Sequence, residues 1–187
     1  MSSSLLSSVV LDQDFKLATL KHYDLITFLS LAQKRKVDFL PITWQSALGH
    51  LGRGGTANVS QSVINIETSF AFKRMDLIVH ERLADPLKET FEKLISELLV
   101  LRNPSLLGHL NIVGLEGICW EVNYGSEEAL PVLVLKKAEF GDLGTFLDSE
   151  RIVKETFNVR IGLCVDIASA TMALHESSMC LASWVII

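Results

Sequence analysis

The chain has 187 residues, of which 49% are hydrophobic and 21% charged, and its formal net charge is −5. This much apolar sequence can build a packed core and excludes global disorder, and an acidic chain with no Lys/Arg-rich stripe is not expected to bind nucleic acid. Cys119, Cys164 and Cys180 lack paired metal spacing, so we expect buried thiols, no metal site and a cytoplasmic protein.

The first 45 residues are expected to form an extension before the main domain. Residues 1–12 are Ser-rich, lack the basic start of a signal peptide and meet an acidic residue too early to cross a bilayer, so no membrane association is expected. Apolar residues recur at three- and four-residue steps over 15–32, which predicts one or two amphipathic helices ending at the basic run 34–36. Residues 38–44 contain a proline and are interpreted as an extended linker.

A second pattern, which alternates between strands and helices, begins near Leu48. Strand character over 59–66 and again over 70–75 predicts a hairpin. The elements predicted beyond it are a helix within 77–101, strands at 112–122 and 130–135, a short helix that starts near 141 and a long apolar helix at 157–175. The hairpin favours an antiparallel sheet with one helix packed on it, so the predicted fold class is α+β.

The glycine-rich stretch Gly52-Arg-Gly54-Gly55-Thr-Ala57-Asn-Val59 is the most informative motif. Glycines let main-chain amides approach phosphate oxygens without interference from a Cβ atom. A dinucleotide-binding fingerprint is excluded because a strand follows the glycines, and a Walker A loop is excluded because Gly-Lys-Ser/Thr is absent. The kinase pattern G-x-G-x-x-G-x-V matches at three positions, with Ala57 in place of the third glycine. A loop with several glycines is, taken alone, most often just a turn.

Two charged residues follow this motif in the order that the kinase pattern requires. Phe70-Ala71-Phe72-Lys73 matches the V-A-I-K strand, in which alanine leaves room for adenine and lysine pairs the phosphates. Taken alone, Lys73 is more readily a surface residue of an alternating strand. Glu97 lies on the following helix, where it could neutralise and orient the lysine. A solvated helix charge is the alternative for Glu97, and Glu92 is an alternative partner for the lysine.

From about Leu48 to Cys180 the sequence resembles a eukaryotic-type protein kinase domain. His109-Leu-Asn-Ile-Val113 resembles the H-P-N-I-V box of that family, and residues 161–175 resemble its long helix that ends in Leu-His. The Ser-rich start and the linker are similar to the lead-in of some fungal kinase-like proteins. The resemblance implies a kinase-like small lobe, a partial helical large lobe and ATP as the ligand.

The resemblance also implies which residues form the nucleotide site. Leu135 corresponds to the gatekeeper, Lys136 to Ala138 to the hinge that binds adenine through main-chain groups, and Asp142 to an acid that contacts ribose. The full set of expected ATP-binding residues is Leu51, Gly52, Gly54, Gly55, Val59, Ala71, Lys73, Leu135, Lys136, Ala138 and Asp142, with Glu97 as the ion-pair partner of Lys73.

The resemblance breaks after His175. A kinase continues there into H-x-D and later D-F-G, but residues 176–187 contain neither, and Leu181 and Ser183 stand roughly where the His and Asp would be. Those residues position the base and hold the metal ions of phosphoryl transfer. We therefore expect no Mg²⁺ ligands, weak or conditional ATP binding and no kinase activity from this chain.

The expected organisation is an extension over 1–45, an incomplete kinase domain over 46–180 and a non-kinase tail over 181–187. The tail is either an element end that folds back on the small lobe or unrelated sequence read through a splice or frame error. Without the rest of a helical lobe, the helix at 157–175 would expose apolar surface that could dock a protein partner. The alternative function is accordingly a non-catalytic, pseudokinase-type interaction module, or a truncated gene product.

Overall fold

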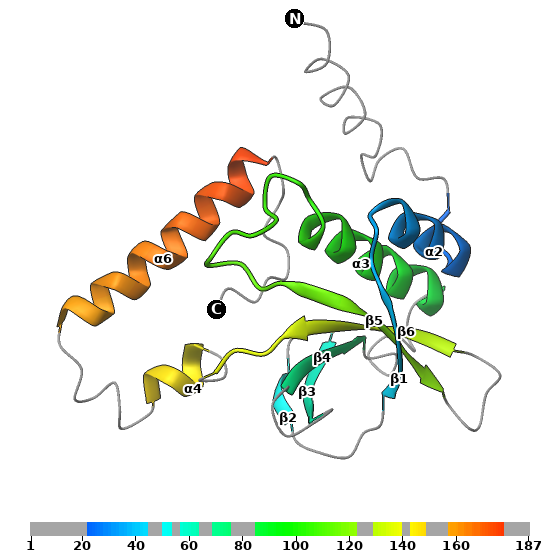
Figure 1. Cartoon of the computed structure of the whole chain (residues 1–187), viewed down its shortest axis with the longest axis horizontal. Helices are drawn as coiled ribbons and strands as arrows, with labels where there is room; N and C mark the ends of the chain where they lie inside the picture. The colour runs from blue at the N-terminus through cyan, green and yellow to red at the C-terminus, as the bar shows by residue number, and fades with distance from the viewer. Residues whose placement is uncertain are drawn as a thin grey trace, which may run out of the picture.

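The computed structural model describes residues 22–44, 50–53, 57–63, 69–75, 85–122, 129–139, 143–148 and 157–177. Their fold is α+β, as the sequence predicts, and is consistent with a kinase-like small lobe (Figure 1). The strands are β1 (Phe39–Trp44), β2 (His50–Arg53), β3 (Ala57–Val63), β4 (Ser69–Met75), β5 (Leu115–Val122) and β6 (Ala129–Lys136). The helices are α2 (Leu25–Lys34), α3 (Pro86–Leu101), α4 (Leu143–Asp148) and α6 (Phe157–Glu176).

The predicted hairpin is confirmed, because β3 and β4 pair antiparallel with Val59 opposite Lys73. β4 also pairs antiparallel with β6, and β6 with β5, so the strands predicted at 112–122 and 130–135 are confirmed as well. All the strands form one sheet in the order β1-β5-β6-β4-β3-β2. β4 therefore lies inside the sheet, where both of its edges are paired and its side chains can be buried.

The segment 39–44 is a strand and not the extended linker that we expected. β1 pairs parallel with β5, which makes the sheet mixed rather than antiparallel throughout. The proline that suggested a linker is compatible with a strand here, because β1 is an edge strand and needs no hydrogen-bond donor on its open side. A parallel pair between segments this far apart leaves no local sequence signal, which is why the pattern missed it.

Close packing fixes β1 on the sheet. A Cβ atom added at Gly117 would lie 2.8 Å from the carbonyl oxygen of Asp38, so only glycine permits this approach. Beside it, the Ile118 N–H donates to the same carbonyl oxygen at 2.9 Å. Phe39 stacks on Trp120 with ring centroids 6.0 Å apart. These contacts make β1 part of the folded unit.

Helix α2 ends at the basic run, as predicted, through a defined backbone turn. Lys36 has a φ of 53°, the Val37 N–H donates to the Ala32 carbonyl and the Lys36 N–H donates to the Gln33 carbonyl. This combination is the Schellman arrangement, in which a left-handed residue closes the helix. Val37 is buried behind it and directs the chain into β1. The part of the predicted helical region before residue 22 lies outside the described residues.

Helix α3 covers one face of the sheet (Figure 1). It begins at Pro86, with Asp85 accepting from the Lys88 N–H at 3.1 Å as its N-cap. Residues 77–84 of the predicted helical region lie outside the described residues. Its apolar side forms the main core with α2 and with residues of β4, β5 and β6, including Leu94, Leu98 and Leu133. The predicted arrangement of a helix packed on a sheet is thus confirmed for α3.

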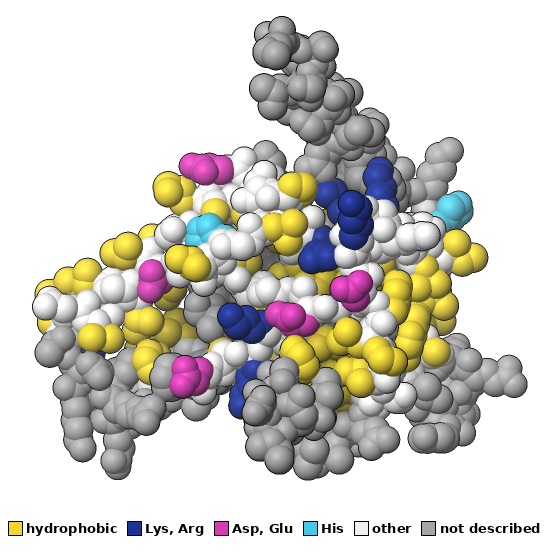
Figure 2. Space-filling model, viewed as in Figure 1, with side chains coloured by type: hydrophobic (Ala, Val, Ile, Leu, Met, Phe, Trp, Pro, Cys, Tyr) yellow, Lys and Arg dark blue, Asp and Glu magenta, His cyan; other side chains and the backbone are white. Residues whose placement is uncertain are grey.

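Helices α4 and α6 confirm the short and long helices predicted after the sheet. Only Ala170 and Leu174 of α6 are buried, whereas Phe157, Val165 and Met172 are 75%, 60% and 60% exposed. Figure 2 shows hydrophobic side chains along this part of the surface. Among the described residues α6 is long and apolar enough to span a membrane by length and composition alone, a test that the core helix of a soluble protein also passes.

Candidate nucleotide site

A buried ion pair between Lys73 of β4 and Glu97 of α3 is the centre of the candidate site. The lysine Nζ lies 2.6 Å from the glutamate Oε1, and the side chains are 9% and 7% exposed. Strand alternation puts Lys73 on the face that α3 covers, together with the core residues Ala71 and Met75, while Phe72 packs on the opposite face. The alternative that Lys73 is a surface residue is therefore excluded, and its partner is Glu97 rather than Glu92.

The surroundings of this pair are electrostatically unusual. Burial raises the pKa of Glu97 above its ordinary value of 4.5, and the attraction of Lys73 opposes that rise only in part. In a buried ion pair, the free-energy cost of removing both charges from water often equals or exceeds their mutual attraction. The pair by itself is therefore weak evidence that it stabilises the fold. A buried carboxylate with a perturbed pKa and a specific cationic partner is instead a candidate functional group.

Two further predicted residues lie beside the ion pair. Ala71 is opposite Leu135 in the β4–β6 ladder, one alternation step from Lys73, and both side chains are buried in the main core. The next residue, Lys136, is exposed at the end of β6, and its N–H donates to the Gly114 carbonyl at 2.9 Å. That N–H is therefore occupied, so an adenine contact at this end of β6 would use other main-chain groups, such as those of Ala138.

The other predicted site residues are described in part or not at all. Leu51 and Gly52 lie in β2, and Gly52 is opposite Val59 of β3, so the backbone of the expected glycine hairpin joins the sheet edge next to β4. Gly54, Gly55 and Asp142 lie outside the described residues. The structure thus brings together Lys73, Glu97, Ala71 and Leu135, with Lys136 and Ala138 following directly.

A polar contact that the sequence did not reveal links α6 to the segment between α3 and β5. The Asn111 side-chain Nδ2 donates to the carbonyl oxygen and to the Oδ1 of Asp166, both at 3.2 Å. Leu106 and Leu174 pack together beside it. Leu110, which replaces the proline of the family's box, is 96% exposed and so removes nothing from the core. A charged residue in an otherwise apolar helix was the one signal that could have pointed to Asp166.

The cysteines correct one expectation. Cys119 is buried, as expected, and burial raises the pKa of its thiol to about 12. Cys164 is exposed on α6, so the expectation of a buried thiol was wrong there, because α6 leaves most of its surface uncovered. Cys180 lies outside the described residues. No cluster of three or more potential metal-ligating His, Cys, Asp or Glu side chains occurs within the ranges that the structure describes.

Comparison with known proteins agrees with the class of protein that these motifs indicate. Over 130 residues, or 68% of this chain, the sequence is 30% identical to "Wall-associated receptor kinase-like 10" of Arabidopsis thaliana. The matched region corresponds to 15% of the length of that protein. No family model matches the chain. The similarity points to a relationship with kinases and gives no evidence about activity or ATP binding.

Proposed function

We propose that the sheet and α3 form a kinase-type small lobe that binds ATP weakly. The observation that carries the proposal is the Lys73–Glu97 ion pair, which is buried and 2.6 Å long. In kinases the equivalent lysine pairs the phosphates and is oriented by the glutamate. A lysine held in this way presents its remaining donors in a fixed direction, which suits a phosphate oxygen as acceptor.

The remainder of the proposed site follows from the strands that flank Lys73. Ala71 and Leu135 would contact adenine, Lys136 and Ala138 would border its polar edge, and the glycine hairpin that begins at Gly52 would cover the phosphates. Leu51, Val59, Gly54, Gly55 and Asp142 complete the proposed set. After the glycine motif the sequence contains no H-x-D or D-F-G segment, so we propose that this chain alone binds nucleotide without transferring a phosphoryl group.

Thermal unfolding with increasing ATP tests this function. Binding to the folded state alone raises stability by RT ln(1 + [ATP]/Kd), so a weak site gives a shift only near or above its Kd. Lys73→Met should abolish the shift, while Lys88→Met, at an exposed position of α3, should retain it. Lys73→Met/Glu97→Gln provides a second test without an unpaired buried charge. Absence of any shift for the unaltered chain up to millimolar ATP would exclude nucleotide binding.

A second candidate function is favoured by the exposed apolar surface of α6. Phe157, Val165 and Met172 point away from the core, and a contiguous apolar surface is typical of an interaction site. On this proposal the chain is a non-catalytic module that binds a protein partner through α6. Solution scattering tests it: association that Val165→Glu suppresses supports the proposal, whereas a well-behaved monomer of the unaltered chain contradicts it.

A further inference from the structure

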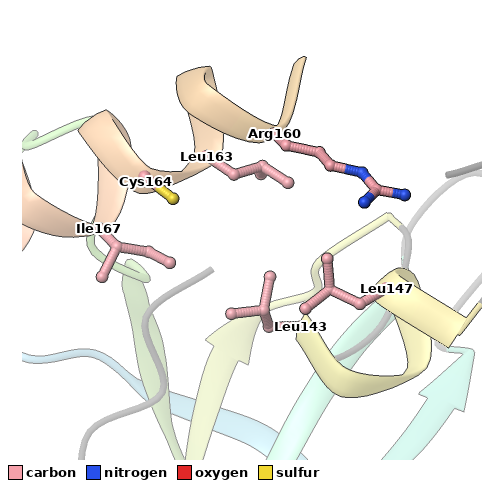
Figure 3. Close-up of a pocket in the computed structure, with 6 residues that line it drawn as sticks. All are labelled: Leu143, Leu147, Arg160, Leu163, Cys164 and Ile167. Atoms are coloured by element: carbon pink, nitrogen blue, oxygen red, sulfur yellow. The ribbon is translucent and has the colours of Figure 1, made fainter. Parts of the chain in front are cut away.

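A pocket of about 270 Å³ lies between α4 and α6, away from the Lys73–Glu97 pair. Its lining residues are Leu143, Leu147, Arg160, Leu163, Cys164 and Ile167. Figure 3 shows Leu143 and Leu147 pointing from α4 towards α6, with Leu163, Cys164 and Ile167 pointing back towards them. The walls are therefore apolar side chains from two separate helices.

The single cation of this pocket is at one end of it. In Figure 3 the guanidinium of Arg160 extends beside Leu147, and Ile167 marks the opposite end. Asp166, the nearest acidic residue along α6, does not line the pocket and is bonded by Asn111 instead. Within the described residues, Arg160 forms none of the ion pairs found, so its planar guanidinium is a hydrogen-bond donor at one end of an open, mostly apolar groove.

We propose that this pocket binds a medium-chain fatty carboxylate. The carboxylate would pair with Arg160, whose planar guanidinium can bond both oxygens, and the alkyl chain would lie against the leucine side chains. At roughly 30 Å³ for each methylene-sized group, the volume of about 270 Å³ corresponds to about nine such groups, which is the number of alkyl carbons of decanoate. Apolar contact between the alkyl chain and the groove supplies affinity, and Arg160 supplies orientation.

Cys164 gives a direct readout because its thiol is exposed and lines the same pocket. We expect decanoate, titrated below its micelle concentration, to slow alkylation of Cys164 by N-ethylmaleimide in a saturable way, as measured on the peptide that contains it by mass spectrometry. Arg160→Gln should weaken the protection by about fivefold, the upper range for an exposed ion pair. Lys88→Gln, another exposed cation, should leave it unchanged.

Three results would overturn the proposal. The first is an alkylation rate of Cys164 that decanoate does not change. The second is equal protection of Cys164 by decanol and by decanoate, or equal protection by decanoate in Arg160→Gln and in the unaltered chain. Either result would exclude a carboxylate-specific site. The third is alkylation of the buried Cys119 in the presence of decanoate, which would mean that the amphiphile unfolds the protein. Leu147→Glu, which puts a negative charge in the groove, should abolish protection while circular dichroism stays unchanged.

Discussion

Replacement of Lys73 by methionine is expected to destabilise the chain in a pH-dependent way. The Nζ–Oε1 separation is 2.6 Å, and at this distance and an effective dielectric constant of about 20 the attraction is about 6 kcal/mol. Desolvation of the two charges offsets most of it. Lys73→Met removes the attraction but leaves the Glu97 carboxylate buried, so at pH 7 we expect a loss of about 3–5 kcal/mol.

The sign of the pH dependence follows from the Glu97 carboxyl. Burial already raises the pKa of Glu97 above 4.5, and loss of Lys73 removes the charge that lowers it, so the pKa rises further in the variant. A group whose folded-state pKa is raised stabilises the fold below its unfolded-state value and loses that contribution as the pH increases through the folded-state value. The destabilisation by Lys73→Met should therefore shrink as the pH is lowered from 7 towards 4.5.

Urea unfolding at a series of pH values measures this effect. The matched control is Lys73→Met/Glu97→Leu, which has no charge at either position and should recover most of the lost stability, since apolar replacement of a buried pair is often neutral or stabilising. Equal stabilities for the single and the double variant, with no pH dependence in either, would refute the reasoning. That result would mean that Glu97 reaches solvent when Lys73 is absent.

Three other substitutions or reactions test separate parts of the fold. Gly117→Ala should cost about 1–3 kcal/mol in urea unfolding, because its Cβ would lie 2.8 Å from the Asp38 carbonyl oxygen; unchanged stability would contradict the β1–β5 pairing. In the folded chain at pH 8, iodoacetamide should modify the exposed Cys164 but not Cys119, because burial raises the pKa of the Cys119 thiol to about 12. Peptide mapping measures which cysteine is modified, and early modification of Cys119 would contradict the prediction. Lys36→Gly should raise the free energy of unfolding by about 1 kcal/mol, since Lys36 has a φ of 53°, and a loss of stability would contradict this assignment.

Local patterns were sufficient for most of the fold and for the centre of the site. The three- and four-residue spacing of apolar residues located α3, and the length and apolar composition of the stretch 157–175 located α6. The Lys73–Glu97 contact was predicted from the kinase pattern, in which a helix that carries a glutamate follows the strand of the lysine, and Glu92 of the same helix remained an alternative partner. The burial of Lys73 could not be predicted, because its neighbours along β4 are compatible with either a buried or an exposed lysine.

Features that depend on distant segments could not be read from the sequence. The β1–β5 pair requires Gly117 to lie against Asp38, and neither residue signals the other. The Arg74–Glu121 ion pair, 2.6 Å long, reaches across β6 and similarly has no local pattern. Arg74 also lies 5.1 Å from the centroid of the Trp44 ring, so it joins β1 to the centre of the sheet. Such contacts emerge only when the strand order is known.

The N-terminal segment contributes to the candidate site through α3. Phe28 of α2 is fully buried and meets Phe91 of α3 at a ring-centroid distance of 6.3 Å. Glu97 lies farther along the same helix, so α3 is packed between α2 and the sheet and cannot shift without opening both contacts. The position of the Glu97 carboxylate relative to Lys73 therefore depends on residues before the sheet as well as on the sheet itself. The segment that looked like an extension and linker is, in physical terms, part of the support of the ion pair.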